Sequence, residues 1–474
     1  MNEKPTILFA TPPVSREERY GSLADAGSAA PALGLLMLAA VVRQAGYRCS
    51  VVDAAALDLD AAAVLARIEA LRPQFLGLTA TTLAIVHAAR LAERVKERLP
   101  EIRIIVGGPH VSAVPVETLE RFPAFDAAVV GEGEETFLEL LHTLTAGGAP
   151  DAVAGIVFRD GDGVHATPRR PYIRDLDTLP LPAWDLLEGF PRLYAPPVFK
   201  TPQLPAASLV TSRGCPNRCI FCDRSVFGAS CHTYSADYVV TMIEQLHRDF
   251  GVREFAFEDD TFVTFRRRLT EICERLIARR IPISWSCLGR VNHVTAETLA
   301  LMRRAGCWQV SYGIESGCEE ILATIRKETT LDQVRQAVRL SRAAGLHTKG
   351  FFIVGHPGET HQTLARTIDF ALELPLDDLS VTMLTPFPGT ELFERAAEFG
   401  TLDPDWGRMS LLNTVFVPHG LTADDLVRAQ AELIRRFYLR PRVVASYLGR
   451  ALRNPAMIAG LGRTFLSFVR SIRT

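Results

Sequence analysis

Three closely spaced cysteines are the residues in this sequence best suited to carry chemistry. Cys215, Cys219 and Cys222 form the pattern C-x-x-x-C-x-x-C directly after a run typical of a β-strand. Thiolates bind iron well, and three on one loop can reach three irons of a [4Fe–4S] cubane. No fourth cysteine is placed to complete the set, so one iron would stay open to an outside ligand. A zinc site is the alternative, although structural zinc usually has four closed protein ligands.

The cysteine loop resembles that of the radical S-adenosylmethionine (radical SAM) superfamily, down to the aromatic Phe221 just before the last cysteine. The resemblance implies that the amino and carboxylate groups of SAM chelate the open iron. One electron from the reduced cluster would then cleave the carbon–sulfur bond. The resulting 5′-deoxyadenosyl radical would abstract a hydrogen atom from a substrate.

Further segments match the same superfamily in the expected order. Glu258, Asp259 and Asp260 resemble the acidic motif that receives the methionine amino group, although Asp260 or Thr261 could instead cap the next helix. Other matching positions are Arg290 near the cofactor carboxylate and Glu315 with Ser316 near the ribose, with a surface ion pair and a helix cap as the alternatives. His356 is a weaker candidate that we expect to be exposed at the mouth of the same domain.

Residues 1–150 alternate short β-branched runs with helical patterns. We expect strands at 6–10, 50–53, 75–79, 102–106 and 127–130, and helices at 33–45, 61–71, 83–99 and 134–144. This alternation predicts a doubly wound, Rossmann-like (flavodoxin-like) parallel sheet covered by helices on both faces. In such sheets a ligand binds beyond the carboxyl ends of the strands.

The remainder divides into three further predicted segments. Residues 151–206 are rich in proline, so we expect a surface linker with one hairpin turn at Gly161–Gly163. Residues 207–395 carry a second β/α series, with expected strands at 208–212, 254–257, 284–287, 309–312, 349–353 and 380–384. Six such strands fit a partial parallel β/α (TIM-like) barrel. Residues 396–474 are expected to form a helical, basic extension.

The first segment resembles the cobalamin-binding domain found upstream of radical SAM barrels. The resemblance rests on 31–36, 51–53, 107–110 and 131–134, and it implies cobalamin contacts from Pro12, Thr79, Thr81, Gly107, Gly108, Gly131 and Gly133. Many cobalamin proteins carry D-x-H-x-x-G, whose histidine binds cobalt from below. Here Asp53 is followed by alanines and no histidine, so either cobalt lacks that ligand or the domain has lost the cofactor and serves for docking.

Two enzymatic functions remain open at this point. The parts resemble class B radical SAM methyltransferases, which methylate an unactivated carbon, and anaerobic Mg-protoporphyrin monomethyl ester cyclases, which perform radical oxidation and cyclisation. A methylthiotransferase is excluded, because that class carries a second cluster on N-terminal cysteines and only Cys49 precedes the linker. A non-catalytic iron–sulfur protein is the remaining alternative, and an open iron fits it poorly.

Composition limits the partners and the compartment. The formal net charge of −2 gives no global attraction to nucleic acid, and neither a signal peptide nor a long apolar run is apparent. Nine cysteines without a secretion signal favour a cytoplasmic enzyme. We expect a small-molecule or lipid-like substrate and an electron donor such as flavodoxin or ferredoxin. Ten arginines after Leu426, with an amphipathic stretch at 458–468, allow peripheral contact with a membrane or simple packing on the barrel.

Overall fold

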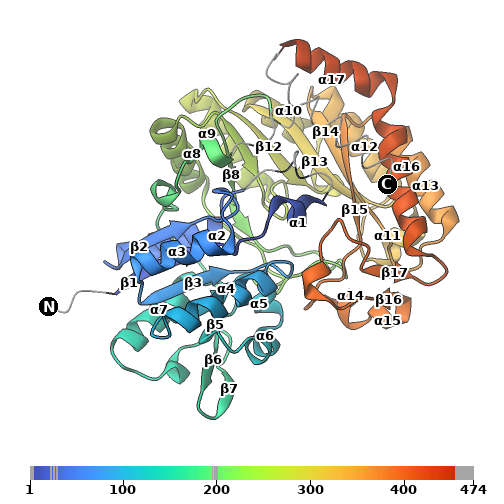
Figure 1. Ribbon diagram of the computed structural model, residues 1–474. Coiled ribbons are helices and arrows are strands. Elements are labelled where there is room, and N and C mark those ends of the chain that lie inside the picture. The colour runs from blue at the N-terminus through green and yellow to red at the C-terminus, as the bar shows by residue number, and fades with distance from the viewer. Residues whose placement is uncertain are drawn as a thin grey trace.

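Two sheets organise the chain, one before and one after residue 200 (Figure 1). The computed structural model describes residues 5–453, except 22, 23, 25, 26, 28, 29, 195 and 197–200. A doubly wound α/β unit comes first, a six-stranded parallel half-barrel follows, and helices end the described chain. The predicted fold class is therefore confirmed.

The first sheet has the strand order β2-β1-β3-β4-β5-β6-β7, in which β1 to β5 are parallel. Its strands are β1 (Thr6–Ala10), β2 (Arg48–Val52), β3 (Phe75–Thr79), β4 (Arg103–Gly107), β5 (Ala127–Val129), β6 (Ile156–Asp160) and β7 (Gly163–Ala166). Its helices are α1 (Arg16–Tyr20), α2 (Leu33–Gln44), α3 (Ala61–Leu71), α4 (Ile85–Arg98), α5 (Pro109–Ala113), α6 (Pro115–Arg121) and α7 (Glu134–Thr145). The order 2-1-3-4-5 is that of flavodoxin-like folds, whose ligands bind where the strand order reverses.

The prediction of a surface linker at 151–206 is wrong in two respects. Strands β6 and β7, joined at the expected turn, extend the first sheet in antiparallel fashion. Farther along, Trp184 and Leu187 are buried in the core, and the amide of Ala183 donates a hydrogen bond to the carbonyl of Leu36 in α2. The segment's prolines end regular elements, but its apolar side chains still bury against the first unit.

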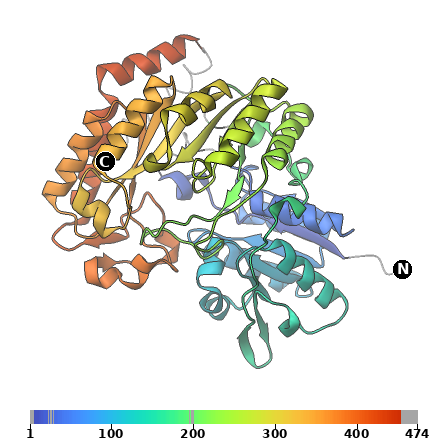
Figure 2. The same cartoon turned by 180° about the vertical axis from the view of Figure 1, so that it is seen from behind.

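The second sheet contains six parallel strands in sequential order, which leave the barrel half closed. They are β8 (Ala206–Leu209), β11 (Glu254–Phe257), β12 (Ser284–Gly289), β13 (Cys307–Glu315), β14 (His347–Val354) and β15 (Asp378–Met383). Helices α8 (Ala236–Phe250), α9 (Arg266–Arg279), α10 (Ala296–Arg304), α11 (Glu319–Thr324), α12 (Leu331–Ala343) and α13 (His361–Glu373) connect them. From behind, these helices cover the outer face of the sheet (Figure 2).

Alternation along the barrel strands separates an apolar outer face from an inner face. In β14, Thr348, Gly350, Phe352 and Val354 are buried, whereas the residues between them are half-buried. Because successive strand residues point to opposite faces, the half-buried set, which includes Lys349, faces the barrel interior. The interior can therefore hold polar side chains and a ligand.

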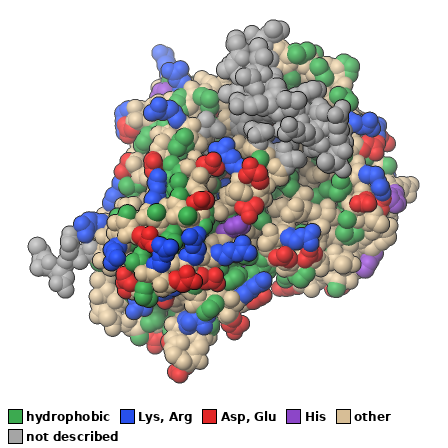
Figure 3. All heavy atoms as spheres, in the orientation of Figure 1, with side chains coloured by type: hydrophobic (Ala, Val, Ile, Leu, Met, Phe, Trp, Pro, Cys, Tyr) green, Lys and Arg blue, Asp and Glu red, His purple; other side chains and the backbone are tan. Residues whose placement is uncertain are grey.

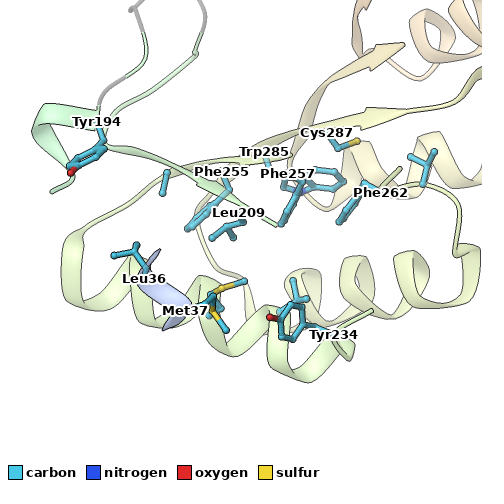
Figure 4. Close-up of a cluster of buried hydrophobic side chains, with 14 of the residues drawn as sticks. Leu36, Met37, Tyr194, Leu209, Tyr234, Phe255, Phe257, Phe262, Trp285 and Cys287 are labelled. Carbon is cyan, nitrogen blue, oxygen red and sulfur yellow. The ribbon is translucent and has the colours of Figure 1, made fainter. Parts of the chain in front are cut away.

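One apolar core continues from the first unit into the half-barrel. Leu36 and Met37 of α2 belong to the same buried cluster as Leu209, Phe255 and Trp285 of the barrel. In Figure 4, Leu36 and Met37 of α2 lie on the side of the sheet that carries Leu209 of β8 and Phe255 of β11. The two units thus bury a common apolar surface and lie in contact.

Helices α16 (Ala423–Tyr438) and α17 (Pro441–Arg453) follow short segments that include α14 (Glu391–Glu394), α15 (Ala396–Phe399), β16 (Gly400–Leu402) and β17 (Phe416–Pro418). Helix α16 packs on α13 and β15 through Leu426, Leu433 and Phe437. Of the two alternatives for this basic region, membrane contact or packing on the barrel, α16 shows the packing. The stretch at 458–468 lies outside the described residues. Within the described chain, no helix is both long enough and apolar enough to span a bilayer.

A glycine in β3 tests the packing of the first sheet. At Gly77, an added Cβ would lie 2.6 Å from the Phe9 ring, whereas at Gly34 of α2 it would meet no atom within 4 Å. Gly77→Ala is expected to lower the free energy of unfolding by about 1–3 kcal/mol through overpacking. Gly34→Ala, the matched control, should leave it unchanged or raise it by up to about 1 kcal/mol. Urea denaturation checks both, and an unchanged Gly77→Ala midpoint would contradict the packing described.

Candidate functional site

A short hairpin closes the base of the cysteine loop. The expected strand at 208–212 is shorter than predicted, because β8 ends at Leu209 and Ser212–Arg213 (β9) pair antiparallel with His232–Thr233 (β10). Gly214 follows with φ +84°, and a Cβ there would collide with the carbonyl oxygen of Ser230. Glycine is therefore required where the chain turns into the loop.

The loop itself is held by hydrogen bonds on both sides. The amide of Ile220 donates to the carbonyl of Ile325 at 3.2 Å, and the carbonyl of Ile220 accepts from Leu392 at 3.0 Å. Asn217 Nδ2 lies 3.0 Å from Cys215 Sγ. In the described chain, no three His, Cys, Asp or Glu side chains converge on a single metal ion. A [4Fe–4S] cubane does not need such convergence, because it binds each thiolate at a different iron.

Two cations lie next to the middle cysteine. Arg290 Nη1 is 3.8 Å from Cys219 Sγ, and its Nη2 donates to the carbonyl of Lys327. A hydrogen bond from Cys222 and the charges of Lys327 and Arg290 lower the pKa of Cys219 to about 6. The thiolate, the form that binds iron, is therefore favoured at this position. Arg290 is buried, so the alternative of a surface ion pair is wrong.

The three residues of the acidic motif differ in their surroundings. Asp259 is fully buried, and its Oδ1 accepts hydrogen bonds from the amide and hydroxyl of Thr211 and from the Ser212 hydroxyl, so it holds the strand end beneath the loop. Glu258 and Asp260 are reached by solvent, but the surrounding protein partly desolvates both carboxyls and raises the pKa of each. The capping alternative is wrong, because α9 begins at Arg266.

At the end of β13, a register shift turns Glu315 inward. Its φ is +68°, and its carboxylate forms a buried ion pair with Lys327 Nζ at 2.6 Å. A non-glycine residue in this conformation carries backbone strain, which is common at functional sites. Ser316 is not a helix cap; its hydroxyl lies 3.0 Å from that of Thr367. The sequence does not predict Lys327 as a site residue, because nothing in its local pattern shows that its side chain reaches Glu315.

His356 lies inside the domain rather than at an exposed mouth. It is fully buried, neither ring nitrogen has a hydrogen-bond partner among the described residues, and its ring is 5.9 Å from that of Phe221. Burial lowers the pKa of His356 to about 3, so the imidazole is neutral. Glu359, whose Oε1 also lacks a partner, and Arg290 Nε add unsatisfied polar atoms near the loop. Such atoms fit a polar ligand bound beside the cysteines.

A cavity of about 260 Å³ occupies the barrel interior. Its polar lining comes from successive strands and includes Glu254, Glu258, Ser286, Gln309, Ser311, Lys349 and Asp378. Trp308 Nε1 donates to Glu254 at 2.6 Å, and Ser284 donates a second hydrogen bond. Burial nevertheless raises the pKa of Glu254 to about 7. The interior can bind a ligand that has hydrogen-bonding groups.

A larger cavity of about 390 Å³ lies where the two units meet. Five of the predicted cobalamin residues line it: Thr79, Gly107, Gly108, Gly131 and Gly133. Added Cβ atoms at Gly107 and Gly131 would come no closer than 3.5 Å to a neighbour, so these glycines keep the cavity wide. Leu209, Tyr234 and Met242 line it from the half-barrel side. Pro12 and Thr81 are not part of its lining.

Two other residues at the strand ends of the first unit are committed to local contacts. Asp53 is buried, and its Oδ1 accepts from the Thr11 hydroxyl at 3.1 Å. The buried His110 ring packs edge-on against Trp406 at 4.4 Å, and its Nδ1 lies 3.2 Å from the Thr82 hydroxyl. One oxygen of Asp53 and one nitrogen of His110 lack partners among the described residues. Both side chains shape the carboxyl edge of the first sheet.

Comparison with known protein families matches both units. Residues 21–141 match the B12 binding domain, and residues 209–371 match the radical SAM superfamily. An uncharacterised methyltransferase of Pyrococcus horikoshii is 34% identical over 420 residues, which cover 88% of this chain and 90% of that protein. The anaerobic magnesium-protoporphyrin IX monomethyl ester cyclase of Rubrivivax gelatinosus is 32% identical over 440 residues, covering 91% and 77% of the two chains.

Solved structures share the arrangement of both units. The radical SAM methyltransferase TsrM from Kitasatospora setae, with cobalamin and a [4Fe–4S] cluster bound, superposes with a TM-score of 0.72 at 19% identity. That match covers 93% of this chain and 90% of TsrM. The cobalamin-dependent enzyme OxsB superposes with a TM-score of 0.74 at 18% identity, covering 98% and 72%. At these identities the likeness is one of fold.

Removing the middle cysteine tests the cluster site. Cys219→Ala is expected to abolish the cubane absorption of anaerobically reconstituted protein and to reduce bound iron and sulfide to background. Cys231→Ala is the matched control, since Cys231 lies in the same region outside the C-x-x-x-C-x-x-C pattern, and it should retain both. Iron and sulfide analysis with visible spectroscopy gives the result. Full cluster content in Cys219→Ala would contradict the assignment.

The raised pKa of Glu254 predicts a pH-dependent stability. Its pKa is about 7 in the folded chain against 4.5 as the ordinary value, so the folded state binds the proton more tightly. Stability from this group is therefore present at low pH and is lost as pH rises from about 4.5 to about 7, by roughly 3 kcal/mol in total. In Glu254→Gln, which keeps an acceptor for Trp308, this loss should disappear. Urea denaturation at several pH values gives the free energy of unfolding of each protein. If that free energy falls equally with pH in wild type and Glu254→Gln, the prediction is contradicted.

Proposed function

We propose that this chain, which belongs to the B12-binding radical SAM family, methylates an unactivated carbon. Its relatives in that family include both methyltransferases and anaerobic Mg-protoporphyrin monomethyl ester cyclases. As a member of that family it is a cobalamin-dependent radical SAM enzyme, and its cofactors are a [4Fe–4S] cluster, SAM and cobalamin. The observation that carries the proposal is the 390 Å³ cavity, because residues of the B12-type unit and of the half-barrel line it together.

The residues of the barrel mouth have distinct proposed tasks. Cys215, Cys219 and Cys222 would hold the cluster, which with SAM supplies a 5′-deoxyadenosyl radical. Glu258 and Asp260 would receive the SAM ammonium group, since carboxylates suit a cation. Arg290, beside Cys219, would receive the carboxylate. Phe221 and the Glu315–Lys327 pair would line the rest of the nucleoside site, whereas Asp259 and Ser316 support the backbone beneath it.

In the first unit, the glycines at the strand ends would admit cobalamin. All four glycines, Gly107, Gly108, Gly131 and Gly133, line one wall of the shared cavity, and Thr79 adds a hydroxyl there. Bound cobalamin would supply the methyl group. Its lower face would receive no imidazole from the loop after β2, where Ala54 and Ala55 follow Asp53.

The barrel interior supports a polar small molecule as substrate. Carboxylates of Glu254, Glu258 and Asp378 and one cation, Lys349, face the 260 Å³ cavity. An acyl chain would exclude water from these groups without offering them a hydrogen bond, at a cost in free energy. We therefore propose a compact substrate that bears hydrogen-bond donors, in preference to a lipid-like one.

A second candidate function is radical oxidation and cyclisation without methyl transfer. The 32% identity to the Rubrivivax gelatinosus cyclase over 91% of this chain favours it.

Enzymes of the family need a reductant, and a flavodoxin or ferredoxin is the proposed donor. Leu439, Val444 and Leu448 are exposed beside Arg442 near the end of the described chain, which supports the proposed peripheral membrane contact. On the face drawn in Figure 3, acidic and basic side chains are interspersed.

Product analysis separates the two candidates. Anaerobic protein reconstituted with iron, sulfide and hydroxocobalamin is incubated with SAM and a chemical reductant. Methyl transfer predicts S-adenosylhomocysteine in addition to 5′-deoxyadenosine, with the former absent when cobalamin is withheld. Formation of 5′-deoxyadenosine without S-adenosylhomocysteine in the fully loaded enzyme would overturn the methyltransferase proposal and favour the cyclase type.

A further inference from the structure

A buried arginine joins the two units at their shared cavity. Arg213 Nη1 lies 2.7 Å from Glu132 Oε1, and its Nη2 lies 2.6 Å from Glu134 Oε1. The three side chains are only 6–7% exposed. Tyr234 Oη accepts a further, longer hydrogen bond at 3.2 Å from the same guanidinium. All four residues line the 390 Å³ cavity.

The residues that form this ion-pair network lie beside the proposed cluster loop on one side and beside the proposed cobalamin-binding turn on the other. Arg213 is the last residue of β9 and stands two positions before Cys215. Glu132 precedes Gly133 in the loop between β5 and α7, and Glu134 is the first residue of α7; this turn lines the proposed cobalamin cavity. The other oxygen of Glu132 accepts from the amide of Ile173 at 2.7 Å, which anchors the carboxylate in its own unit. One guanidinium therefore ties the cluster loop to the B12-type loop.

Arginine is suited to fix this geometry. Its planar fork presents separate N–H groups in set directions, so each carboxylate is held at one angle as well as one distance. The apolar core shared by the two units has no such directionality, because dispersion contacts allow small slides between surfaces. Burial of two carboxylates with one guanidinium is costly, and such groups often specify one arrangement more than they add stability.

We propose that Arg213 is a positioning residue that fixes the separation between the cobalamin and the iron–sulfur cluster. The inference rests on the proposed cobalamin site and is independent of the substrate. A misplacement of about 1 Å between reacting groups can cost about 100-fold in rate, so a loop tie of this kind bears on the chemistry without touching substrate.

Arg213→Lys tests the proposal, since lysine keeps the charge and loses the fork. The readout is the magnetic interaction between cob(II)alamin and the reduced cluster in protein loaded with both cofactors, measured by pulsed electron paramagnetic resonance. The variant is expected to show a broader or shifted distance distribution than wild type at equal iron and cobalt content. With SAM, the rate of S-adenosylhomocysteine formation should fall by up to about 100-fold, whereas 5′-deoxyadenosine formation stays within about twofold.

Two further variants keep the test decisive. Arg170→Lys is the matched control, because Arg170 bonds Glu139 and Thr136 of the first unit, and it should match wild type in every readout. The combined variant Arg213→Met, Glu132→Gln, Glu134→Gln removes the buried charges and serves if Arg213→Lys fails to load its cofactors. An unchanged distance distribution in either loaded variant would overturn the proposal. A wild type without cob(II)alamin signal would instead refute the proposed cobalamin site.

Discussion

In the proposed site one loop must place three thiolates on three irons of a [4Fe–4S] cubane and leave the fourth iron open, and much of the surrounding structure serves that constraint. The loop is closed by the β9–β10 pair, turned by Gly214 and supported from below by Asp259. The cations Arg290 and Lys327 lie on one side of it, where they favour thiolates and the anionic end of a ligand. Acids at the end of β11 provide the complementary charge.

The second constraint is that two parallel sheets must present their carboxyl ends to a common space. A shared apolar core brings α2 against β8 and α8, and the cavity between the units takes its lining from both sides. Glycines of the first unit line that space, while Arg213 and its two carboxylates fix the orientation of its walls. The proposed cluster and cobalamin sites thereby become parts of one site.

Local pattern was enough to predict most elements, because each strand and helix carries its own periodicity. The helix at 61–71 and the strands at 6–10, 75–79 and 254–257 have the predicted bounds. The linker was mispredicted because proline marks the end of an element without indicating what Trp184 or Leu187 packs against. His356 was misplaced for the same reason, since burial depends on neighbours distant in sequence. Lys327 and the ties of Arg213 depend on contacts across 12 and about 80 residues, which local spacing cannot encode.

The central claim is that one iron corner is open and binds SAM. The most direct measurement is the electron paramagnetic resonance spectrum of the reduced cluster, recorded before and after SAM is added to anaerobically prepared protein. The account predicts a cubane signal whose g values shift when the amino and carboxylate groups of SAM bind the open iron. A cubane signal that SAM leaves unchanged, or the absence of any such signal, would contradict it.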